Sequence, residues 1–248
     1  MTFANRLAAT TLATLIPFCA IAESNTDAIK TQLEKQNPSL KIKSVASSPM
    51  PGLYEVFANG NILYVDKTAK HVLAGATLVE DATKRNLTVE RLKELTAIKF
   101  DSLPFKDAIE IKKGSGAYRF AVFSDPDCPY CKTLEQGLKK LGISDYTAYI
   151  FLFPLEELHA EARWKAESIW CTQDRSAAWQ AWMIEGKLPE KTTCENPVDA
   201  TIKLGRELDV MATPTIYLGN GYQTTSPQEL VDAINQKSLG ITEPKSAN

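Results

Sequence analysis

The stretch Ala121-Val-Phe-Ser-Asp-Pro-Asp-Cys128-Pro-Tyr-Cys131-Lys-Thr-Leu-Glu135 decides the fold. An apolar run from Tyr118 to Phe123, typical of a β-strand, leads through a polar turn into two cysteines that open a predicted helix. A cysteine at a helix N-terminus faces unpaired backbone N–H groups and the positive end of the helix dipole, and both stabilise a thiolate. We therefore predict a redox dithiol, with Cys128 as the nucleophile and the more shielded Cys131 as the thiol that resolves a mixed disulfide.

Two questions about this dithiol stay open at the level of sequence. Asp125 and Asp127 lie just upstream, and either carboxylate would oppose ionisation of the sulfur by like-charge repulsion if it pointed there. A C-x-x-C pair can also be half of a zinc site. Zinc would need two further ligands at matching spacing, and only two distant cysteines and two histidines remain outside the N-terminal segment. We therefore predict no metal and no other cofactor.

Residues 1–22 have the layout of a cleavable secretory signal peptide. Arg6 is followed by a short, mostly apolar run, Leu7–Phe18, and by Ala20-Ile21-Ala22, which is an A-x-A cleavage site. A membrane anchor would need about 18 or more apolar residues, and a lipid anchor on Cys19 would follow a bulky residue; both stay open as alternatives. Export would take the mature chain to a compartment where disulfides persist.

The remaining cysteines predict a second disulfide. Removal of the signal also removes Cys19 and leaves four cysteines, an even number. The closely spaced Cys128 and Cys131 leave Cys171 and Cys194 as the simplest second bridge. Closing that loop would stabilise the fold by about 3 kcal/mol, so we interpret the bridge as structural. The alternative, a second redox-active pair, would lack the short spacing.

Charge and composition indicate which classes of partner to expect and how many domains the chain can form. The chain has 28 Lys and Arg against 30 Asp and Glu, a formal net charge of −2, and no basic stripe. Nucleic acid is therefore not an expected partner. Hydrophobic residues make up 44% of the 248 residues, which supplies a core for one large domain or two small ones.

Residues 23–82 form a small, predicted β-rich domain. The pattern predicts one helix and then four strands: Thr26–Gln36, Leu40–Ala46, Leu53–Ala58, Ile62–Asp66 and Val72–Val79. Asn59-Gly60 is a strong hairpin signal, because both residue types tolerate positive φ. A sheet this small buries little surface and leaves its edges unpaired. We predict that a second copy pairs with an edge to form a homodimer; packing of the domain on the rest of the chain is the alternative.

A linker helix follows, within predicted boundaries of 83–104. Leucines at near-helical spacing, with charged residues between them, predict a helix over Asp81–Leu95. Thr88 is its predicted N-cap, and the helix ends before Asp101-Ser102-Leu103-Pro104. A helix would hold two domains apart where a Gly/Ser tether would let them collapse.

The C-terminal domain, residues 105–248, has a recognisable order of elements. The predicted elements are a strand Ala117–Phe123, the dithiol helix Cys128–Leu141, a strand Tyr146–Phe153, an α-rich segment Leu155–Leu208, a strand Thr215–Leu218, a turn Gly219-Asn220-Gly221, and a closing helix with Ser226 as N-cap and Pro227 at its first position. This is the order of a thioredoxin fold. In that context Thr213-Pro214 is predicted to be a cis bond whose exposed backbone edge holds an extended substrate beside the sulfur, although an X-Pro bond alone is cis only about 5% of the time.

The α-rich segment is marked by its tryptophans. It contains Trp164, Trp170, Trp179 and Trp182, the last two three residues apart. They could be imagined as an aromatic box for a cofactor, but aromatic residues at helical spacing are mostly core, and we predict core. Cys171 lies among them, so a bridge to Cys194 would pin this helical segment to itself.

Three stretches carry a resemblance to a known family. They are Phe123-Ser-Asp-Pro-Asp-Cys128-Pro-Tyr-Cys131, Ile169-Trp170-Cys171-Thr-Gln-Asp-Arg-Ser-Ala-Ala-Trp179-Gln-Ala-Trp182-Met and Ala212-Thr213-Pro214-Thr. With the signal, the β-rich domain and the linker, they resemble the periplasmic disulfide isomerases of the DsbC/DsbG family over essentially the whole mature chain. The resemblance implies an α+β fold: a thioredoxin-like C-terminal domain with a helical insertion, a small β-rich (cystatin-like) N-terminal dimerisation domain, and a linker helix.

The resemblance also implies a function. It implies a V-shaped homodimer in the periplasm of a Gram-negative bacterium, acting on unfolded or misoxidised exported proteins and kept reduced by a membrane thiol reductant of the DsbD type. Pro129 and Tyr130 would tune the redox potential and substrate choice, and Thr213 and Pro214 would bind substrate. The dipeptide is Gly-Tyr in the best-known DsbC and Pro-Tyr in DsbG, whereas the Trp-rich segment is closer to DsbC.

Other functional classes share parts of this pattern. A DsbG-like reductase or chaperone would protect single cysteines, and a thiol oxidase would use the same site but favour a monomer. A holdase chaperone would keep its activity when both Cys128 and Cys131 are mutated, whereas a metal-binding carrier would hold zinc through Cys128. The agreement of the dithiol with the export signal favours an enzyme of thiol:disulfide interchange that rearranges non-native disulfides.

Overall fold

The computed structural model describes residues 20–238, which divide into two compact units. Residues 20–58 and 63–76 form the N-terminal unit, and residues 59–62 and 77–238 form the C-terminal unit. Most of the predicted signal peptide lies outside the described residues, and the predicted domain boundaries stay a prediction. Among the described residues, no helix combines the length and the apolar character that crossing a membrane requires.

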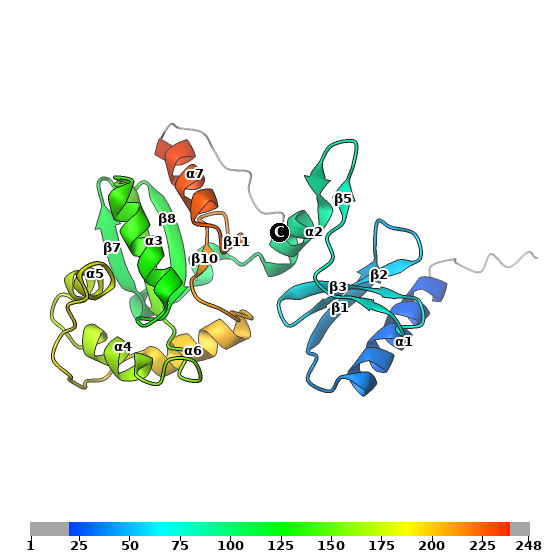
Figure 1. Ribbon diagram of the computed structural model, residues 1–248, viewed down its shortest axis with the longest axis horizontal. Helices are drawn as coiled ribbons and strands as arrows, with labels where there is room; N and C mark the ends of the chain where they lie inside the picture. The colour runs from blue at the N-terminus through cyan, green and yellow to red at the C-terminus, as the bar shows by residue number, and fades with distance from the viewer. Residues whose placement is uncertain (1–19, 239–248) are drawn as a thin grey trace, which may run out of the picture. The chain divides into compact units, whose positions relative to one another are not determined.

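The N-terminal unit is a helix packed on a four-stranded sheet (Figure 1). Its elements are α1 (Ala20–Gln36), β1 (Ile42–Ser47), β2 (Leu53–Ala58), β3 (Asn61–Asp66) and β4 (Val72–Leu73), and the strands lie in sequence order. Ile29 and Leu33 of α1 are buried in one cluster with Val56 and Val65 of the sheet. The predicted hairpin turn is confirmed, since Asn59 and Gly60 have φ of 49° and 71°.

Three predictions for residues 72–95 are wrong: one strand, the start of one helix and the N-cap of that helix. Val72–Val79 is not one strand: β4 ends at Leu73, and β5 (Val79–Glu80) pairs instead with β6 (Arg85–Asn86). Gly75 interrupts the extended run with a φ of 70°, a conformation that glycine adopts without a steric penalty.

The helix predicted over Asp81–Leu95 begins later, as α2 (Leu87–Thr96). Its N-cap is Asn86, whose side chain accepts a hydrogen bond from the Val89 N–H at 2.9 Å, and not Thr88. The Thr88 hydroxyl accepts from the Leu78 N–H at 2.8 Å instead. Asn and Thr are both common N-cap residues. Here the hydrogen bond from Leu78 engages the Thr88 hydroxyl, and Asn86 is the residue that caps the helix.

The C-terminal unit has the predicted elements in the predicted order, around a five-stranded sheet whose edge strand at Ile109–Lys113 was not predicted (Figure 1). The strands are β7 (Ile109–Lys113), β8 (Tyr118–Ser124), β9 (Tyr146–Leu152), β10 (Thr215–Tyr217) and β11 (Gln223–Thr224), in the order β11-β10-β8-β9-β7. The helices are α3 (Pro129–Lys140), α4 (Ala162–Trp170), α5 (Arg175–Glu185), α6 (Val198–Glu207) and α7 (Pro227–Ser238), with short 3-10 turns η1 (Phe100–Ser102) and η2 (Phe105–Asp107). The β8–β9 pair is parallel, whereas β7–β9, β8–β10 and β10–β11 are antiparallel.

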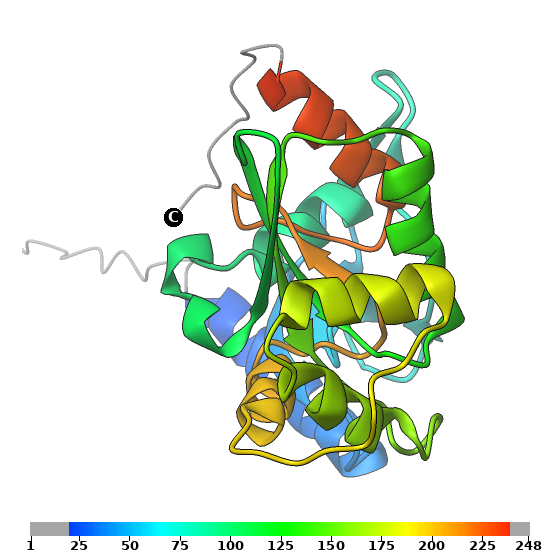
Figure 2. The ribbon, with the colours of Figure 1, turned by 90° about the vertical axis from the view of Figure 1, so that its left-hand side faces the viewer.

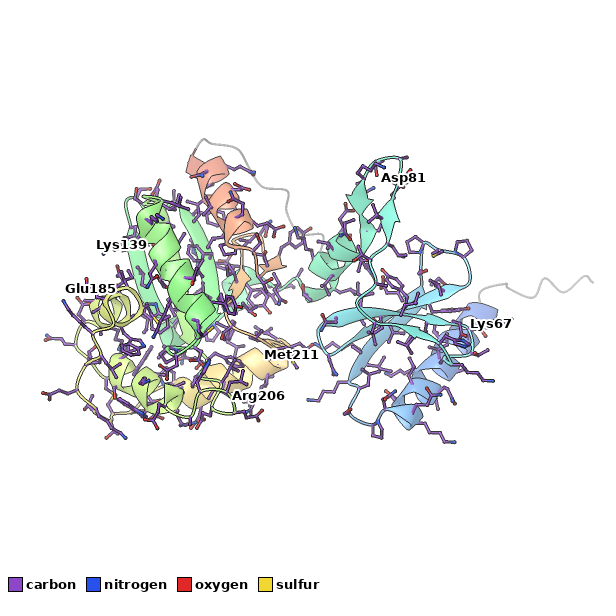
Figure 3. The ribbon with its side chains drawn as sticks, viewed as in Figure 1. Lys67, Asp81, Lys139, Glu185, Arg206 and Met211 are labelled. Atoms are coloured by element: carbon purple, nitrogen blue, oxygen red, sulfur yellow. A yellow bond between two sulfur atoms is a disulfide. The ribbon has the colours of Figure 1, made fainter. Side chains whose placement is uncertain are left out.

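The central strand β8 divides the core of this unit in two. Phe120 and Val122 join the cluster that contains residues of α3, α4, α5 and α7, whereas Ala121 and Phe123 join the cluster under η1 and the end of α6. Successive side chains of a strand point to opposite faces, so the stretch 120–123, which is buried on both faces, is apolar at every position. Figure 2 shows the sheet between these two layers, and Figure 3 shows α3 and α5 side by side, with Lys139 and Glu185 near their ends.

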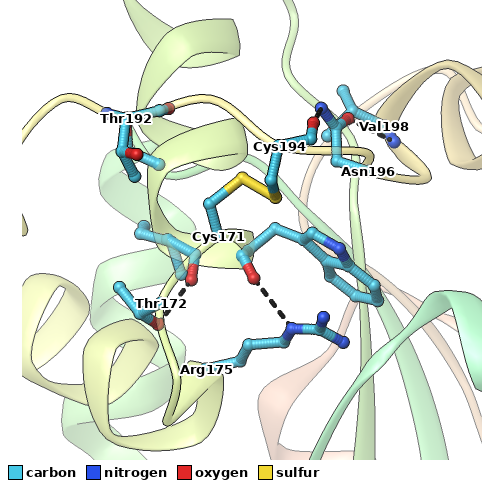
Figure 4. Close-up of a disulfide and its surroundings, with 10 residues drawn as sticks. Cys171, Thr172, Arg175, Thr192, Cys194, Asn196 and Val198 are labelled. Atoms are coloured by element: carbon cyan, nitrogen blue, oxygen red, sulfur yellow. Dashed lines mark hydrogen bonds between the residues drawn. A yellow bond between two sulfur atoms is a disulfide. The ribbon is translucent and has the colours of Figure 1, made fainter.

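The tryptophans and the second pair of cysteines lie in the helical insertion between β9 and β10. Trp170 and Trp179 are buried, as predicted for core residues, whereas Trp164 and Trp182 are partly exposed. Cys171 and Cys194 form the predicted disulfide, with their Cα atoms 5.7 Å apart (Figure 4). Beside it Arg175 stacks on the Trp170 ring at 3.8 Å and donates to the Trp170 carbonyl at 2.8 Å. The bridge therefore joins the end of α4 to the loop before α6.

Two helical glycines provide a matched test of this packing. A Cβ atom at Gly205 of α6 would clash with the Phe153 ring, whereas one at Gly137 of α3 would meet no other atom within 4 Å. Gly205→Ala should therefore lower the free energy of unfolding by about 1–3 kcal/mol, despite alanine's higher helix propensity. Gly137→Ala should raise it by about 0.5–1 kcal/mol. Urea unfolding of the disulfide-intact protein measures both, and equal effects of the two substitutions would contradict this account.

Candidate active site

The dithiol lies at the N-terminus of α3. Cys128 is the N-cap residue, with extended φ and ψ of −68° and 121°. Pro129 takes the first helical position, where a missing backbone N–H costs nothing. Cys131, in the first turn, is completely buried, whereas Cys128 keeps 4% of its surface exposed. Both cysteines are free thiols, so the strand, turn and helix bring two sulfurs of unequal exposure to the positive end of one helix.

The two thiols differ strongly in acidity. A hydrogen bond from the Cys131 thiol is the main cause that lowers the pKa of Cys128 to about 5, against the opposing effect of burial. The Thr213 side chain and the backbone N–H groups of Cys131 and Tyr130 lower it further. The same hydrogen bond, together with burial, raises the pKa of Cys131 far above its usual value. At neutral pH the pair therefore holds one proton, on Cys131, and one negative charge, on Cys128.

The loop before β10 faces the sulfur of Cys128. The Thr213–Pro214 bond is cis, as predicted, and the Cys128 thiol donates to the Thr213 carbonyl at 3.2 Å. The Thr213 hydroxyl is buried and has no hydrogen-bond partner among the described residues. A thiolate can no longer donate to that carbonyl, but it can accept a hydrogen bond from this hydroxyl.

Two exposed apolar side chains belong to the segments that carry the dithiol and the cis bond. Tyr130, between the two cysteines, is 75% exposed. Met211, labelled in Figure 3, lies two residues before Thr213 and is 67% exposed. Large exposed side chains of this kind are suited to contact with another chain. The structure thus brings Cys128, Cys131 and Thr213 together, whereas the bridged Cys171 and Cys194 lie in the helical insertion.

The two carboxylates before the dithiol are both engaged by other groups. Asp125 is completely buried and accepts hydrogen bonds from the backbone N–H groups of Asp127 and Leu155, each at 2.7 Å. It also shares a hydrogen bond of 3.0 Å with Nδ1 of His159. Asp127 forms an ion pair with Lys165, whose Nζ lies 2.7 and 2.8 Å from its two carboxylate oxygens. Each carboxylate therefore has a cationic, imidazole or backbone N–H partner.

Three residues of the helical insertion hold the active-site turn, and the sequence did not predict them. Besides His159 and Lys165, the Trp182 indole N–H donates to the Pro126 carbonyl at 2.7 Å. They come from positions more than 30 residues after the turn, so no local spacing links them to it. In the part of the chain that the structure describes, no group of three or more His, Cys, Asp or Glu side chains could hold a metal ion.

Comparisons with known proteins agree with this site. Residues 20–89 match the family described as "Disulfide bond isomerase protein N-terminal domain", and residues 105–236 match "Thioredoxin-like domain". A "Probable thiol:disulfide interchange protein DsbC" of Bordetella avium (strain 197N) is 38% identical over 192 residues, which cover 77% of this chain and 67% of that protein. The "Thiol:disulfide interchange protein DsbC" of Escherichia coli (strain K12) is 27% identical over 209 residues, covering 84% and 85%.

A solved structure agrees as well. The crystal structure of a disulfide interchange protein from Neisseria gonorrhoeae is 39% identical, with a TM-score of 0.52, and the match covers 57% of this chain and all of that one. The resemblance stated from the sequence motifs is therefore confirmed. The dithiol at the start of α3, the thioredoxin-like sheet and these relatives agree: the chain belongs to the DsbC family of thiol:disulfide interchange proteins.

Proposed function

We propose that this protein rearranges non-native disulfides in exported proteins, with Cys128 as the attacking thiolate and Cys131 as the resolving thiol. The observation that carries the proposal is the pair of free thiols of unequal burial at the N-terminus of α3, where the pKa of Cys128 is lowered and that of Cys131 is raised. A thiolate is the nucleophile in disulfide exchange, and a thiol with a low pKa is also a good leaving group. Cys128 therefore suits both the attack on a client and the later release.

The reaction begins with attack of the Cys128 thiolate on one sulfur of a client disulfide. The client S–S bond breaks, a mixed disulfide forms, and the displaced client sulfur leaves as a thiolate. A different client thiolate then attacks its own half of the mixed disulfide, which forms the rearranged bond and returns Cys128 as a thiolate. No net oxidation or reduction occurs in this route.

A second route applies when no client thiolate attacks. Cys131 then loses its proton to solvent and attacks the sulfur of Cys128, and the client leaves as a thiolate. The products are a Cys128–Cys131 disulfide and a client reduced by two electrons. Return to the dithiol needs two electrons from outside, and we propose a membrane thiol reductant of the DsbD type as their source.

Further roles belong to the same proposal. Thr213 and Pro214 hold an extended client segment beside the sulfur, and Pro129 and Tyr130 tune the redox potential. The Cys171–Cys194 bridge is structural. We place the mature protein in the periplasm, after cleavage of residues 1–22, and we propose that the N-terminal unit joins two copies.

Single serine substitutions separate the two thiols. Cys128→Ser should abolish the refolding of a scrambled multi-disulfide substrate, because no sulfur remains to attack it. Cys131→Ser should keep the attack and accumulate covalent client adducts, because the second route is blocked. Non-reducing gel electrophoresis and recovery of substrate activity measure both results. Isomerase activity retained by Cys128→Ser would show the assignment to be wrong.

The low pKa of Cys128 makes the stability of the reduced protein depend on pH. The folded state ionises Cys128 above about pH 5, whereas an unfolded cysteine stays protonated until about pH 8.5. The stabilisation is therefore complete above the unfolded pKa and is lost as the pH falls through about 5. Between about pH 5 and 8, the reduced wild type should gain up to about 1.4 kcal/mol per pH unit over reduced Cys128→Ser.

Urea unfolding at several pH values measures this difference. The oxidised wild type is the control, because its Cys128 carries no titratable proton and should lack the additional slope. If the free energy of unfolding changed with pH in the same way for the reduced wild type and for reduced Cys128→Ser, the low pKa of Cys128 would be contradicted.

The proposed dimer has a direct test on the N-terminal sheet. β4 lies at an edge of this sheet, and its Val72 and Leu73 are 44% and 49% exposed. Apolar residues on an open edge strand favour pairing with another chain. Light scattering should give about twice the monomer mass for the wild type, and Val72→Lys should shift the equilibrium toward monomer. Val79→Lys, at another exposed valine outside this sheet, is the matched control. A monomeric wild type would rule out the dimer.

A further inference from the structure

Asp127 places a carboxylate directly before the proposed nucleophile. Its side chain is only 16% exposed, so water screens its charge poorly. A like charge close to a sulfur opposes ionisation of that sulfur. An Asp127 carboxylate without a cation partner would therefore oppose ionisation of Cys128.

Lys165 of α4 supplies the opposite charge. Its Nζ contacts both carboxylate oxygens of Asp127, at 2.7 and 2.8 Å, and its side chain is also only 16% exposed. The ammonium lies 5.2 Å from the centre of the Trp182 ring and 5.8 Å from that of Trp164. Two contacts to one carboxylate and two aromatic faces hold this cation in one position.

The other charged groups near the turn have different arrangements. The Asp125 carboxylate accepts two backbone N–H groups and contacts His159, so its bonds are completed without Lys165. Lys132 of α3 follows Cys131 in the sequence, and its Nζ lies 4.2 Å from the centre of the Trp182 ring. Among the described residues, no carboxylate pairs with it. Lys165 is thus the cation that the structure pairs with the carboxylate adjoining Cys128.

We propose that Lys165 is a positioning residue that neutralises Asp127 and fixes its direction, and thereby keeps Cys128 ionised at neutral pH. The inference rests on the proposed function, because it assigns Lys165 a task in the attack by Cys128. Trp182 supports the same arrangement from two sides, since it donates to the Pro126 carbonyl and lies under the Lys165 ammonium. Through Lys165 and Trp182, the helical insertion would therefore influence the ionisation of Cys128 as well as hold the active-site turn.

A double-mutant cycle tests this assignment. The variants are Lys165→Met, Asp127→Asn and the two combined, in the reduced full-length protein. The readout is the midpoint pH of Cys128 alkylation by iodoacetamide, followed by mass spectrometry of the labelled peptide. Lys165→Met should raise the midpoint by about 1 pH unit, because the carboxylate loses its cation. Asp127→Asn should lower the midpoint, and the double variant should return close to the wild-type value.

Two further variants separate charge from packing. Lys165→Arg keeps a cation and should keep a midpoint near that of the wild type. Lys191→Met removes an ammonium that lies 5.0 Å from the Trp164 ring centre and has no carboxylate partner in the described part of the chain, so it should leave the midpoint unchanged. If Lys165→Met does not fold, the lowered midpoint of Asp127→Asn still tests the proposal.

The possible failures can be told apart. An unchanged midpoint in Lys165→Met, or an equal rise in Lys165→Met and in the double variant, would overturn the inference alone, because the effect would then not depend on Asp127. An unchanged midpoint in Asp127→Asn would do the same. A wild-type Cys128 that titrates like an ordinary cysteine would overturn the proposed function, and this inference with it.

Discussion

The hydrogen bond between the thiol of Cys131 and the sulfur of Cys128 is the interaction on which the rest of the site depends. Two chemically identical groups become an acid and a base because one is the N-cap of α3 and the other lies in its first turn. Helix geometry places them close enough to share a proton, and burial of Cys131 makes it the group that keeps the proton. The asymmetry between the two thiols therefore arises from their places in the fold.

The fold has to hold this geometry against the cost of burying polar atoms. β8 is buried on both faces and delivers the chain to the turn in a fixed direction. The turn itself then carries two carboxylates and the Pro126 carbonyl, and buried surroundings tolerate such groups only when hydrogen-bond partners are present. The helical insertion provides those partners through His159, Lys165 and Trp182. A thioredoxin-like sheet alone would leave the turn without them.

Local sequence pattern was sufficient for the dithiol, the strand before it, the helix after it and the Asn59-Gly60 hairpin, because neighbouring residues determine each of them. It was sufficient for the Cys171–Cys194 pairing because few pairings were possible. It failed for Val72–Val79, where Gly75 interrupts the extended run, and for Thr88, where Asn86 forms the cap instead. It could not identify Lys165, because an exposed lysine and a lysine paired with Asp127 look alike until the insertion is placed beside the turn.

The two cysteine pairs differ in their state because they lie in different surroundings. Cys128 and Cys131 are three residues apart at one helix end, where their environments differ and the thiolate is stabilised. Cys171 and Cys194 are separated by 23 positions, and their bridge closes a loop of the insertion. Trp182 lies inside that loop and Lys165 lies six residues before it, so the bridge restricts the segment whose side chains hold the active-site turn. In the proposed mechanism one pair exchanges partners with a client, while the other limits the movement of the segment that holds the active-site turn.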